Sequence, residues 1–437
     1  MKKSLLALAA LSVLASVAQA DNGTDVQLYG ILDEGVAHID HSLSANQQFT
    51  FSLNPYNIPA AQGPASGSVN TLVSGGASMS QWGIKGNEDL GGGMKAFFRL
   101  ESAINLNSGT LANNGQTVLN NANSLTTISG ASSINGQLFS RAAYVGLADS
   151  QFGSLQLGRT TAFSLDQTVE FDPLKGSGLY SPIGFSGGIG GGLGATENTR
   201  LDNSFKYENK VGPIGFGVQY KMAQNTSSVA ADVGSVLEGM VSYRNGPLSL
   251  EATMSESKNT PMLGFKLFTN DVSLRVSDTN GTMLTAKYDL TSEAALTAGY
   301  ERTEQSTPSG SKNWGTQINN YYGMPIAGDV TAKAFDPSWG DAVVTTAWIG
   351  GRYKVTSNFV LNAGYYNIDN QANKHNDQYT IQALSLLADY NFSKHTDVYA
   401  GLMLTHYDGD YLKQQSSPTV TLASSNSIVG AGVRVRF

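Results

Sequence analysis

A glycine-rich stretch and a few polar clusters are the residues whose types could bind a cofactor or a metal, or carry out catalysis. Residues 188–194, GIGGGLG, have the glycine spacing of a dinucleotide-binding loop, but that fingerprint requires a preceding strand and a following helix, which the sequence does not offer. The five histidines follow no metal-ligand spacing or Ser-His signature, and Asp408-Gly409-Asp410 fits a turn better than a divalent-cation site. The chain has no cysteine, which excludes catalytic thiols and thiolate metal sites. We therefore expect no cofactor, no metal and no enzymatic activity.

Charged residues instead alternate with apolar ones. One segment places three charged residues on one face of an extended chain and three apolar residues on the other: Lys95, Arg99 and Glu101 against Ala96, Phe98 and Leu100. The last segment places two arginines between apolar residues: Val433, Arg434, Val435, Arg436 and Phe437. A strand with lipid on one side and a watery lumen on the other explains such charges without the cost of burying them.

Segments of this kind recur along the chain, and we interpret sixteen of them as strands because they alternate with period two and are rich in Tyr, Val, Leu and Thr. They are expected near residues 26–38, 79–88, 93–103, 139–148, 152–160, 200–209, 214–222, 237–244, 247–256, 282–290, 294–304, 345–355, 358–369, 379–392, 395–407 and 426–437.

The connections between these segments alternate strictly between short turns and long polar loops. The short ones contain hairpin residues such as Asn245-Gly246. The long ones are rich in Gly, Ser and Asn and cover 39–78, 104–138, 161–199, 223–236, 257–281, 305–344, 370–378 and 408–425. A transmembrane up-and-down barrel accounts for this order, because it has an even number of strands of about 9–11 residues, short periplasmic turns and long outer loops. The predicted fold is therefore an all-β, sixteen-stranded antiparallel transmembrane barrel with a loop folded into its lumen.

Composition and the first residues agree with this fold. Mean hydropathy is only −0.17, and no apolar run after Ala20 reaches the length of about 20 residues that a membrane-spanning helix requires. Residues 1–20 carry Lys2 and Lys3, an apolar stretch and Ala18-Gln19-Ala20, the layout of a secretory signal peptide. We expect cleavage after Ala20 and one barrel domain over 21–437. The net charge of −7 argues against nucleic acid as a partner.

Several motifs, in their order and spacing, resemble the trimeric general-diffusion porins of Gram-negative bacteria, most closely the betaproteobacterial branch. They are Leu28–Asp33 (LYGILD), Ser80–Gly91 (SQWGIKGNEDLG), Phe97–Glu101 (FFRLE), Ser140–Leu147 (SRAAYVGL), Phe152–Arg159 (FGSLQLGR) and the final Phe437. The resemblance covers almost the whole mature chain. It implies an outer-membrane location, a homotrimer with one water-filled pore per subunit, and contact with outer-membrane lipid and lipopolysaccharide. It further implies that Phe437 is a signal for the outer-membrane assembly machinery.

The resemblance also implies that the third long loop, 161–199, narrows the pore, with acidic groups facing basic groups on the wall. The acidic candidates on the loop are Asp166, Glu170 and Asp172, of which Glu170-Phe171 resembles the acidic-aromatic pair of the family. The basic or polar candidates on the wall are Arg141, Arg200, Arg99, Lys85 and Gln81. Gln81 replaces an arginine that the family usually has before Trp82-Gly83, which removes a positive charge. Arg159 fits either the mouth of this loop or a subunit contact.

The expected function is passive diffusion of ions and small hydrophilic solutes through the outer membrane. The alternative is a substrate-selective channel of the same fold, which would show a saturable site along the lumen. An outer-membrane enzyme, recognisable by loss of activity on a single Ser or His substitution, and an adhesin that acts through its long loops are further alternatives.

Overall fold

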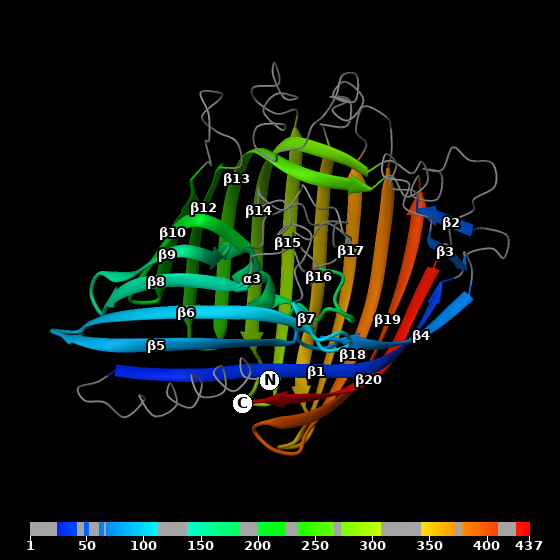
Figure 1. Ribbon diagram of the computed structural model, residues 1–437, viewed down its shortest axis with the longest axis horizontal. Helices are drawn as coiled ribbons and strands as arrows, with labels where there is room; N and C mark the ends of the chain where they lie inside the picture. The colour runs from blue at the N-terminus through cyan, green and yellow to red at the C-terminus, as the bar shows by residue number, and fades with distance from the viewer. Residues whose placement is uncertain are drawn as a thin grey trace, which may run out of the picture.

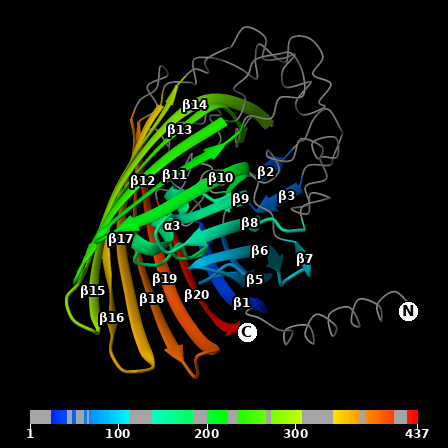
Figure 2. The same ribbon diagram turned by 90° about the vertical axis from the view of Figure 1, so that its left-hand side faces the viewer.

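The structure is a computed structural model. It describes residues 24–41, 48–51, 61–64, 67–111, 138–183, 200–222, 235–265, 272–306, 342–371, 378–409 and 425–437. Most of these residues lie in strands, and every strand pair is antiparallel. Figures 1 and 2 show the strands wrapped round into one wall, with a short helix, α3 (Phe163–Phe171), on its inner side. The expected signal peptide lies outside the described residues.

The barrel wall follows the order of the chain. Its first half consists of β1 (Thr24–His41), β4 (Gly67–Ser74), β5 (Gln81–Gly91), β6 (Met94–Asn105), β8 (Ala142–Asp149), β9 (Gly153–Thr161), β10 (Arg200–Val211) and β11 (Ile214–Lys221). Its second half consists of β12 (Ser235–Asn245), β13 (Leu248–Phe265), β14 (Val272–Asp289), β15 (Ala294–Ser306), β16 (Ala342–Lys354), β17 (Phe359–Gln371), β18 (Tyr379–Asn391), β19 (Thr396–Gly409) and β20 (Ser425–Arg436). Three short strands add to the loops: β2 (Gln48–Phe51), β3 (Ala61–Pro64) and β7 (Thr110–Leu111).

The wall closes where β1 meets β20, with Ile31–His41 paired to Asn426–Arg436. On its other edge, β1 pairs first with β5, along Thr24–Ile31, and then with β4, along Glu34–His41. The strands β4 and β5 are therefore two halves of one wall strand, interrupted at residues 75–80. With this pair counted once and β7 set aside, the wall has the sixteen strands that the sequence predicted.

Side-chain burial in the wall is the reverse of that in a water-soluble protein. On β14, Leu284 is 50% exposed while its neighbour Thr285 is 6% exposed, and on β18 Leu386 is 43% exposed while Ser385 is 0% exposed. Apolar residues outside and polar residues inside require a lipid surround and a polar lumen. The predicted strand phase is confirmed at the final strand too, where Arg434 is only 9% exposed. Within the described segments, no helix is both long enough and apolar enough to cross a membrane.

Two stretches that the sequence assigned to long loops belong to strands. The hairpin of β13 and β14 continues to Phe265 and resumes at Val272, past a register shift between Ser257 and Thr260, so the predicted loop 257–281 is too long. Residues 67–74 form β4 rather than part of the loop 39–78. Backbone pairing needs no alternation of side chains, which is why the pattern did not show the ends of these strands.

The buried apolar side chains lie between the wall and residues that follow α3, rather than between two sheets. Leu174 and Tyr180 pack among Trp348, Tyr366 and Tyr399, which face inward from β16, β17 and β19. A loop packed into the lumen thus supplies the core that a barrel of this size lacks. Loop 3, as used below, denotes residues 162–183.

Candidate constriction in the barrel lumen

The helix of loop 3 takes its N-terminal cap from the wall. Ala162 at the N-cap position has no side-chain acceptor, and Glu238 of β12 replaces it. The backbone N–H of Phe163 donates to Glu238 Oε2 at 2.7 Å, and the Ser164 hydroxyl donates to Oε1 at 2.9 Å. A carboxylate there satisfies a free helix N–H and stabilises the positive end of the helix dipole. Glu238 therefore fixes where α3 begins.

Three further hydrogen bonds hold the middle and the end of α3. Gln167 Nε2 donates to the Glu251 carbonyl oxygen and to Thr285 Oγ1, both at 2.9 Å. Trp348 Nε1 donates to the Phe171 carbonyl oxygen at 3.2 Å. These partners come from β13, β14 and β16, so the helix lies along the inner face of this part of the wall.

Asp172 forms the turn that follows the helix. Its carboxylate accepts hydrogen bonds from the Tyr366 hydroxyl at 2.5 Å and from the backbone N–H groups of Leu174 at 3.2 Å and Gly176 at 2.6 Å. Asp172 is 2% exposed, so it does not lie with the two other acidic candidates in water. Burial raises the pKa of this carboxyl above its ordinary value, although the hydrogen bonds from Tyr366 and Gly176 oppose the rise.

The raised pKa of Asp172 predicts a pH dependence of stability. A carboxyl whose pKa is higher in the folded than in the unfolded protein contributes stability at low pH and loses it as the pH rises through the folded-state pKa. The free energy of unfolding of the wild type, relative to the Asp172→Ala variant, should therefore decrease from acid to neutral pH. Melting temperatures of both proteins in detergent across this range check the sign. Tyr366→Phe keeps the carboxyl and should keep the dependence; a flat difference would contradict the assignment.

The far end of loop 3 is attached to the interruption between β4 and β5. The Ser177 hydroxyl and the Leu179 backbone N–H both donate to the Gly76 carbonyl oxygen, at 2.7 Å and 3.0 Å. The Tyr180 ring packs edge-on against the Tyr399 ring, with 6.2 Å between centroids. Because residues 75–80 leave the strand ladder, the Gly76 carbonyl is free to accept these bonds. Loop 3 therefore leaves the wall after β9, follows its inner face and ends at the broken strand.

The acidic residues Asp166 and Glu170 project from α3 and pair with basic residues of the wall. Asp166 pairs with Lys206 of β10, and Glu170 pairs with Arg244 of β12 at 2.6 Å. Both acids stay partly in water, with 47% and 42% of the side chain exposed. Arg244 also pairs with Glu251 at 2.9 Å. Sequence reasoning missed Lys206 and Arg244, although Lys206 has the inward phase of its strand.

Three of the five predicted wall residues contact one carboxylate that the sequence did not single out, Glu101 of β6, and a fourth, Lys85, lies beside the Tyr29 ring. We call Tyr29, Gln81, Lys85, Arg99, Glu101 and Arg141 the Glu101 cluster. Arg99 pairs with Glu101, and Arg141 Nε lies 2.7 Å from its Oε1. The Tyr29 hydroxyl donates to Oε2 at 2.7 Å, and Gln81 Nε2 donates to it at 3.4 Å. Lys85 Nζ lies 5.0 Å from the centre of the Tyr29 ring.

The fifth residue, Arg200, opens β10 and lies within electrostatic reach of Arg141, Arg159, Glu101 and Asp166. Its backbone pairs with Thr161 of β9, next to the start of loop 3. Arg159, for which a subunit contact was an alternative, is 7% exposed. It pairs with Asp202, and its Nε donates to the Ser140 carbonyl oxygen at 2.8 Å, so these two contacts lie within its own barrel.

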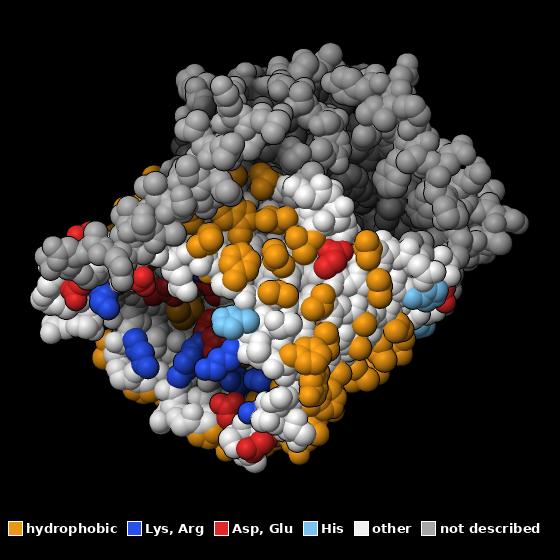
Figure 3. Space-filling view, turned by 60° about the horizontal axis from the view of Figure 1, so that its bottom comes forward, with side chains coloured by type: hydrophobic (Ala, Val, Ile, Leu, Met, Phe, Trp, Pro, Cys, Tyr) orange, Lys and Arg blue, Asp and Glu red, His pale blue; other side chains and the backbone are white. Residues whose placement is uncertain are grey.

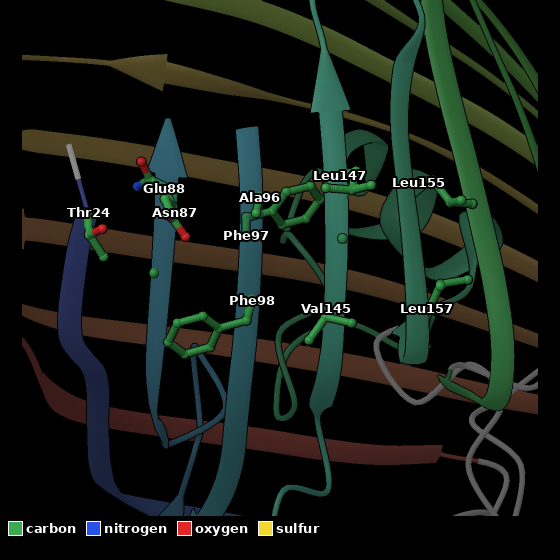
Figure 4. A pocket seen from close by; sticks show the side chains of 12 residues that line it. Thr24, Asn87, Glu88, Ala96, Phe97, Phe98, Val145, Leu147, Leu155 and Leu157 are labelled. Carbon is green, nitrogen blue, oxygen red and sulfur yellow. The ribbon is translucent and has the colours of Figure 1, made fainter. Parts of the chain in front are cut away.

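The outer surface of the first strands carries an apolar groove of about 450 Å³ between β5, β6, β8 and β9 (Figure 4). Its lining is formed mainly by outward-facing side chains: Phe98, Val145, Leu147, Leu155 and Leu157. The groove exists because small residues face outward beside larger ones. At Gly86, for example, an added Cβ would lie 2.6 Å from the Phe98 ring.

A closed barrel with a lipid-facing exterior and a loop fixed in a charged lumen defines a transmembrane β-barrel whose passage is narrowed from within. Residues 7–410 match the family described as Gram-negative porin. The chain belongs to the Gram-negative porin family, as the sequence motifs indicated, and its location is the Gram-negative outer membrane.

Curated relatives and solved structures support the family and the fold. An outer membrane porin protein of Bordetella pertussis is 30% identical over 261 residues, which cover 57% of this chain and 58% of the relative. Outer membrane porin protein 32 of Delftia acidovorans is 30% identical over 281 residues, which cover 63% and 66%. The chain thus spans less than two thirds of the length of either relative. These proteins are named as porins rather than enzymes.

Among solved structures, the anion-selective porin from Comamonas acidovorans has a TM-score of 0.63 at 22% identity, covering 95% of this chain and 100% of that one. The outer membrane protein OmpT of Vibrio cholerae has a TM-score of 0.59 at 14% identity, covering 96% of this chain and 99% of that one. At these identities the similarity shows the fold.

Proposed function

We propose that the protein is a passive channel for ions and small hydrophilic solutes across the outer membrane. The observation that carries the proposal is the reversed burial of the wall together with a loop attached to the inner face at both ends. A polar, charged lumen admits water and solutes, and a fixed loop narrows it without closing it by motion. No covalent chemistry and no cofactor enter this function.

The constriction, in this proposal, lies between α3 and the Glu101 cluster. Asp166 and Glu170 form its acidic side, whereas Arg99, Arg141, Lys85, Gln81 and Arg200 form its basic and polar side. Asp172 acts by positioning the loop. The two acids already have basic partners, and two arginines pair with the single Glu101 carboxylate while Lys85 lies beside the adjacent Tyr29 ring. We therefore infer a preference for anions, the property that the Comamonas acidovorans porin carries in its description.

The homotrimer follows as part of the same proposal. One Vibrio cholerae OmpT structure of this fold is described as a trimer form. The apolar groove on β5, β6, β8 and β9 offers a surface that a second copy of the chain can cover. Phe437 fits the proposed role in assembly because its backbone N–H and carbonyl oxygen bond to Gly30 at 3.1 and 3.0 Å, which extends the seam between the first and last strands.

Conductance of the purified protein in a planar bilayer under a salt gradient tests the function. We expect current steps in groups of three, a linear dependence of current on salt concentration, and a reversal potential with the sign of anion preference. An absence of steady conductance would overturn the channel. Saturation of the chloride current itself as the salt concentration rises would replace general diffusion with a selective channel, and single steps would overturn the trimer.

A further inference from the structure

Lys175, in the turn after α3, has a backbone conformation that is unusual for its residue type. Its φ is +54°, and Asn203 is the other non-glycine residue with positive φ among those described. The turn is held by Asp172, whose carbonyl oxygen accepts from the Lys175 N–H at 2.9 Å and whose carboxylate accepts from Gly176. Left-handed conformations at non-glycine residues are unfavourable and cluster at functional sites. Glycine or asparagine would adopt this backbone conformation at a lower energetic cost than lysine. A lysine at this position therefore indicates that its charge has a function.

The turn lies directly against β16 and β17. An added Cβ at Gly350 would lie 2.5 Å from Pro173 Cγ, and one at Gly364 would lie 2.8 Å from the same atom. These two glycines let the turn approach the wall. Arg352 is the next residue of β16 with the inward phase of Trp348 and Gly350. Pro173 lies directly against Gly350. Lys175 and Arg352 each follow one of these two residues by two positions in the sequence.

A third basic residue reaches the same region from β14. Lys287 has the inward phase of Thr285, whose hydroxyl accepts a hydrogen bond from Gln167 of α3. Beyond Thr285, β14 runs through Lys287 to a short turn, and beyond Gly350, β16 runs through Arg352 to another short turn. Lys287 and Arg352 therefore lie between loop 3 and the short turns. Figure 3, which brings this end of the molecule forward, shows a hollow in which lysine and arginine side chains gather, with aspartate and glutamate side chains beside them.

The positive charge of Lys175, Lys287 and Arg352 is only partly compensated. Among the described residues, no carboxylate lies within 4.0 Å of Lys175 Nζ or the Arg352 guanidinium, while Lys287 Nζ lies 3.4 Å from Asp289. Burial lowers the pKa of Lys175, and the charges of Arg352 and Lys287 lower it further, against the opposing charge of Asp389. Like charges held together in this way are stabilised by a bound anion.

We propose that Lys175, Lys287 and Arg352 form a binding subsite for small dianionic oxyanions on the side of loop 3 that faces the short turns. The proposal rests on the proposed channel function, and it adds a saturable site to the diffusion path. Two negative charges match three cations that lack full compensation, and the guanidinium of Arg352 can bind two oxygens of one oxyanion. A monovalent halide satisfies only one of these cations at a time.

Sulfate inhibition of chloride current tests the subsite. In planar bilayers with potassium chloride, sulfate should inhibit the wild-type current in a saturable manner, with potassium chloride of equal ionic strength as the reference. Lys175→Asn tolerates the backbone conformation and removes the charge, and it should raise the half-inhibiting sulfate concentration about five-fold, as loss of one unit charge at contact distance in water predicts. Arg352→Gln should act in the same direction, while Lys175→Arg should keep the wild-type value.

The matched control is Lys258→Asn, because Lys258 lies 3.4 Å from Glu256 near the outer end of β13, away from the hollow. This variant should behave as the wild type. Wild-type current unaffected by sulfate, or equal inhibition of Lys175→Asn and wild type, would overturn the subsite while leaving the channel intact. A protein that does not conduct would overturn the proposed function instead. Calorimetric titration of the detergent-solubilised barrel with sulfate would then decide on the subsite separately, since saturable heat should appear in the wild type and weaken in Lys175→Asn.

Discussion

The Asp172→Ala variant is expected to have a noisy single-channel current with a larger mean conductance than the wild type. The substitution removes the acceptor of the Tyr366 hydroxyl and of the Leu174 and Gly176 N–H groups. Each buried donor left without a partner costs about 1–3 kcal/mol. The turn would then lose its fixed position beside β16 and β17, and loop 3 would move within the lumen. Single-channel recordings, together with the melting temperature in detergent, measure both consequences.

A matched control lies on the same strand as Tyr366. Asp369 accepts hydrogen bonds from Thr380 and Asn367, both at 2.8 Å, and neither partner belongs to loop 3. Asp369→Ala should therefore leave the current quiet. Tyr366→Phe removes one of the three bonds and should give an intermediate result. A quiet, wild-type current from Asp172→Ala would show that Asp172 does not hold the loop.

The double variant Asp166→Asn/Glu170→Gln should shift the reversal potential strongly toward anion preference. The change leaves Lys206 without its acidic partner and leaves Arg244 with Glu251 alone. One unit charge at contact distance is worth about 1 kcal/mol in water, or about five-fold in relative permeability. Reversal potentials in a salt gradient near 0.1 M, where the screening length is about 10 Å, measure the shift. Glu170→Gln alone should move the potential in the same direction by a smaller amount.

The same change outside the lumen provides the control for this prediction. Glu256 faces outward on β13 and lies 3.4 Å from Lys258, so Glu256→Gln alters the net charge but not the lumen. Its reversal potential should equal that of the wild type. An unchanged potential in the double variant would remove Asp166 and Glu170 from the constriction, whereas equal shifts in both variants would assign the effect to overall charge.

The wall of the barrel was predictable because two independent signals agree along the whole chain. Period-two alternation locates the strands, and the order of short and long connections specifies an even, up-and-down barrel. The interruption at residues 75–80 and the extension of β13 to Phe265 were not predictable, because both depend on backbone pairing with a neighbour. The helix α3 was not predicted either. It has only nine residues, and its N-terminal cap comes from Glu238 of β12, so its own sequence does not show a complete helix signal.

The sequence indicated candidate residues for the site, but it did not indicate which of them form ion pairs with each other. Asp166 and Glu170 do project from the predicted loop, but strand register decides that their partners are Lys206 and Arg244. A single sequence contains no register between strands that are far apart. For the same reason Glu101 appeared only as one charge among others, although the predicted residues Gln81, Arg99 and Arg141 contact it. Asp172 is buried and Asp166 is not. Composition and spacing in the sequence do not predict this difference.

The way the barrel closes has a consequence for the order in which the protein can be made. One edge of β1 is covered by β20, and the Tyr399 hydroxyl donates to Asp33, 366 residues away, at 2.6 Å. The first strand therefore keeps an uncovered edge until the last strand has left the ribosome. An open edge is unstable in lipid and prone to aggregation in water. Insertion must consequently follow synthesis of β20, and every nascent copy depends on being kept unfolded until that strand has been made.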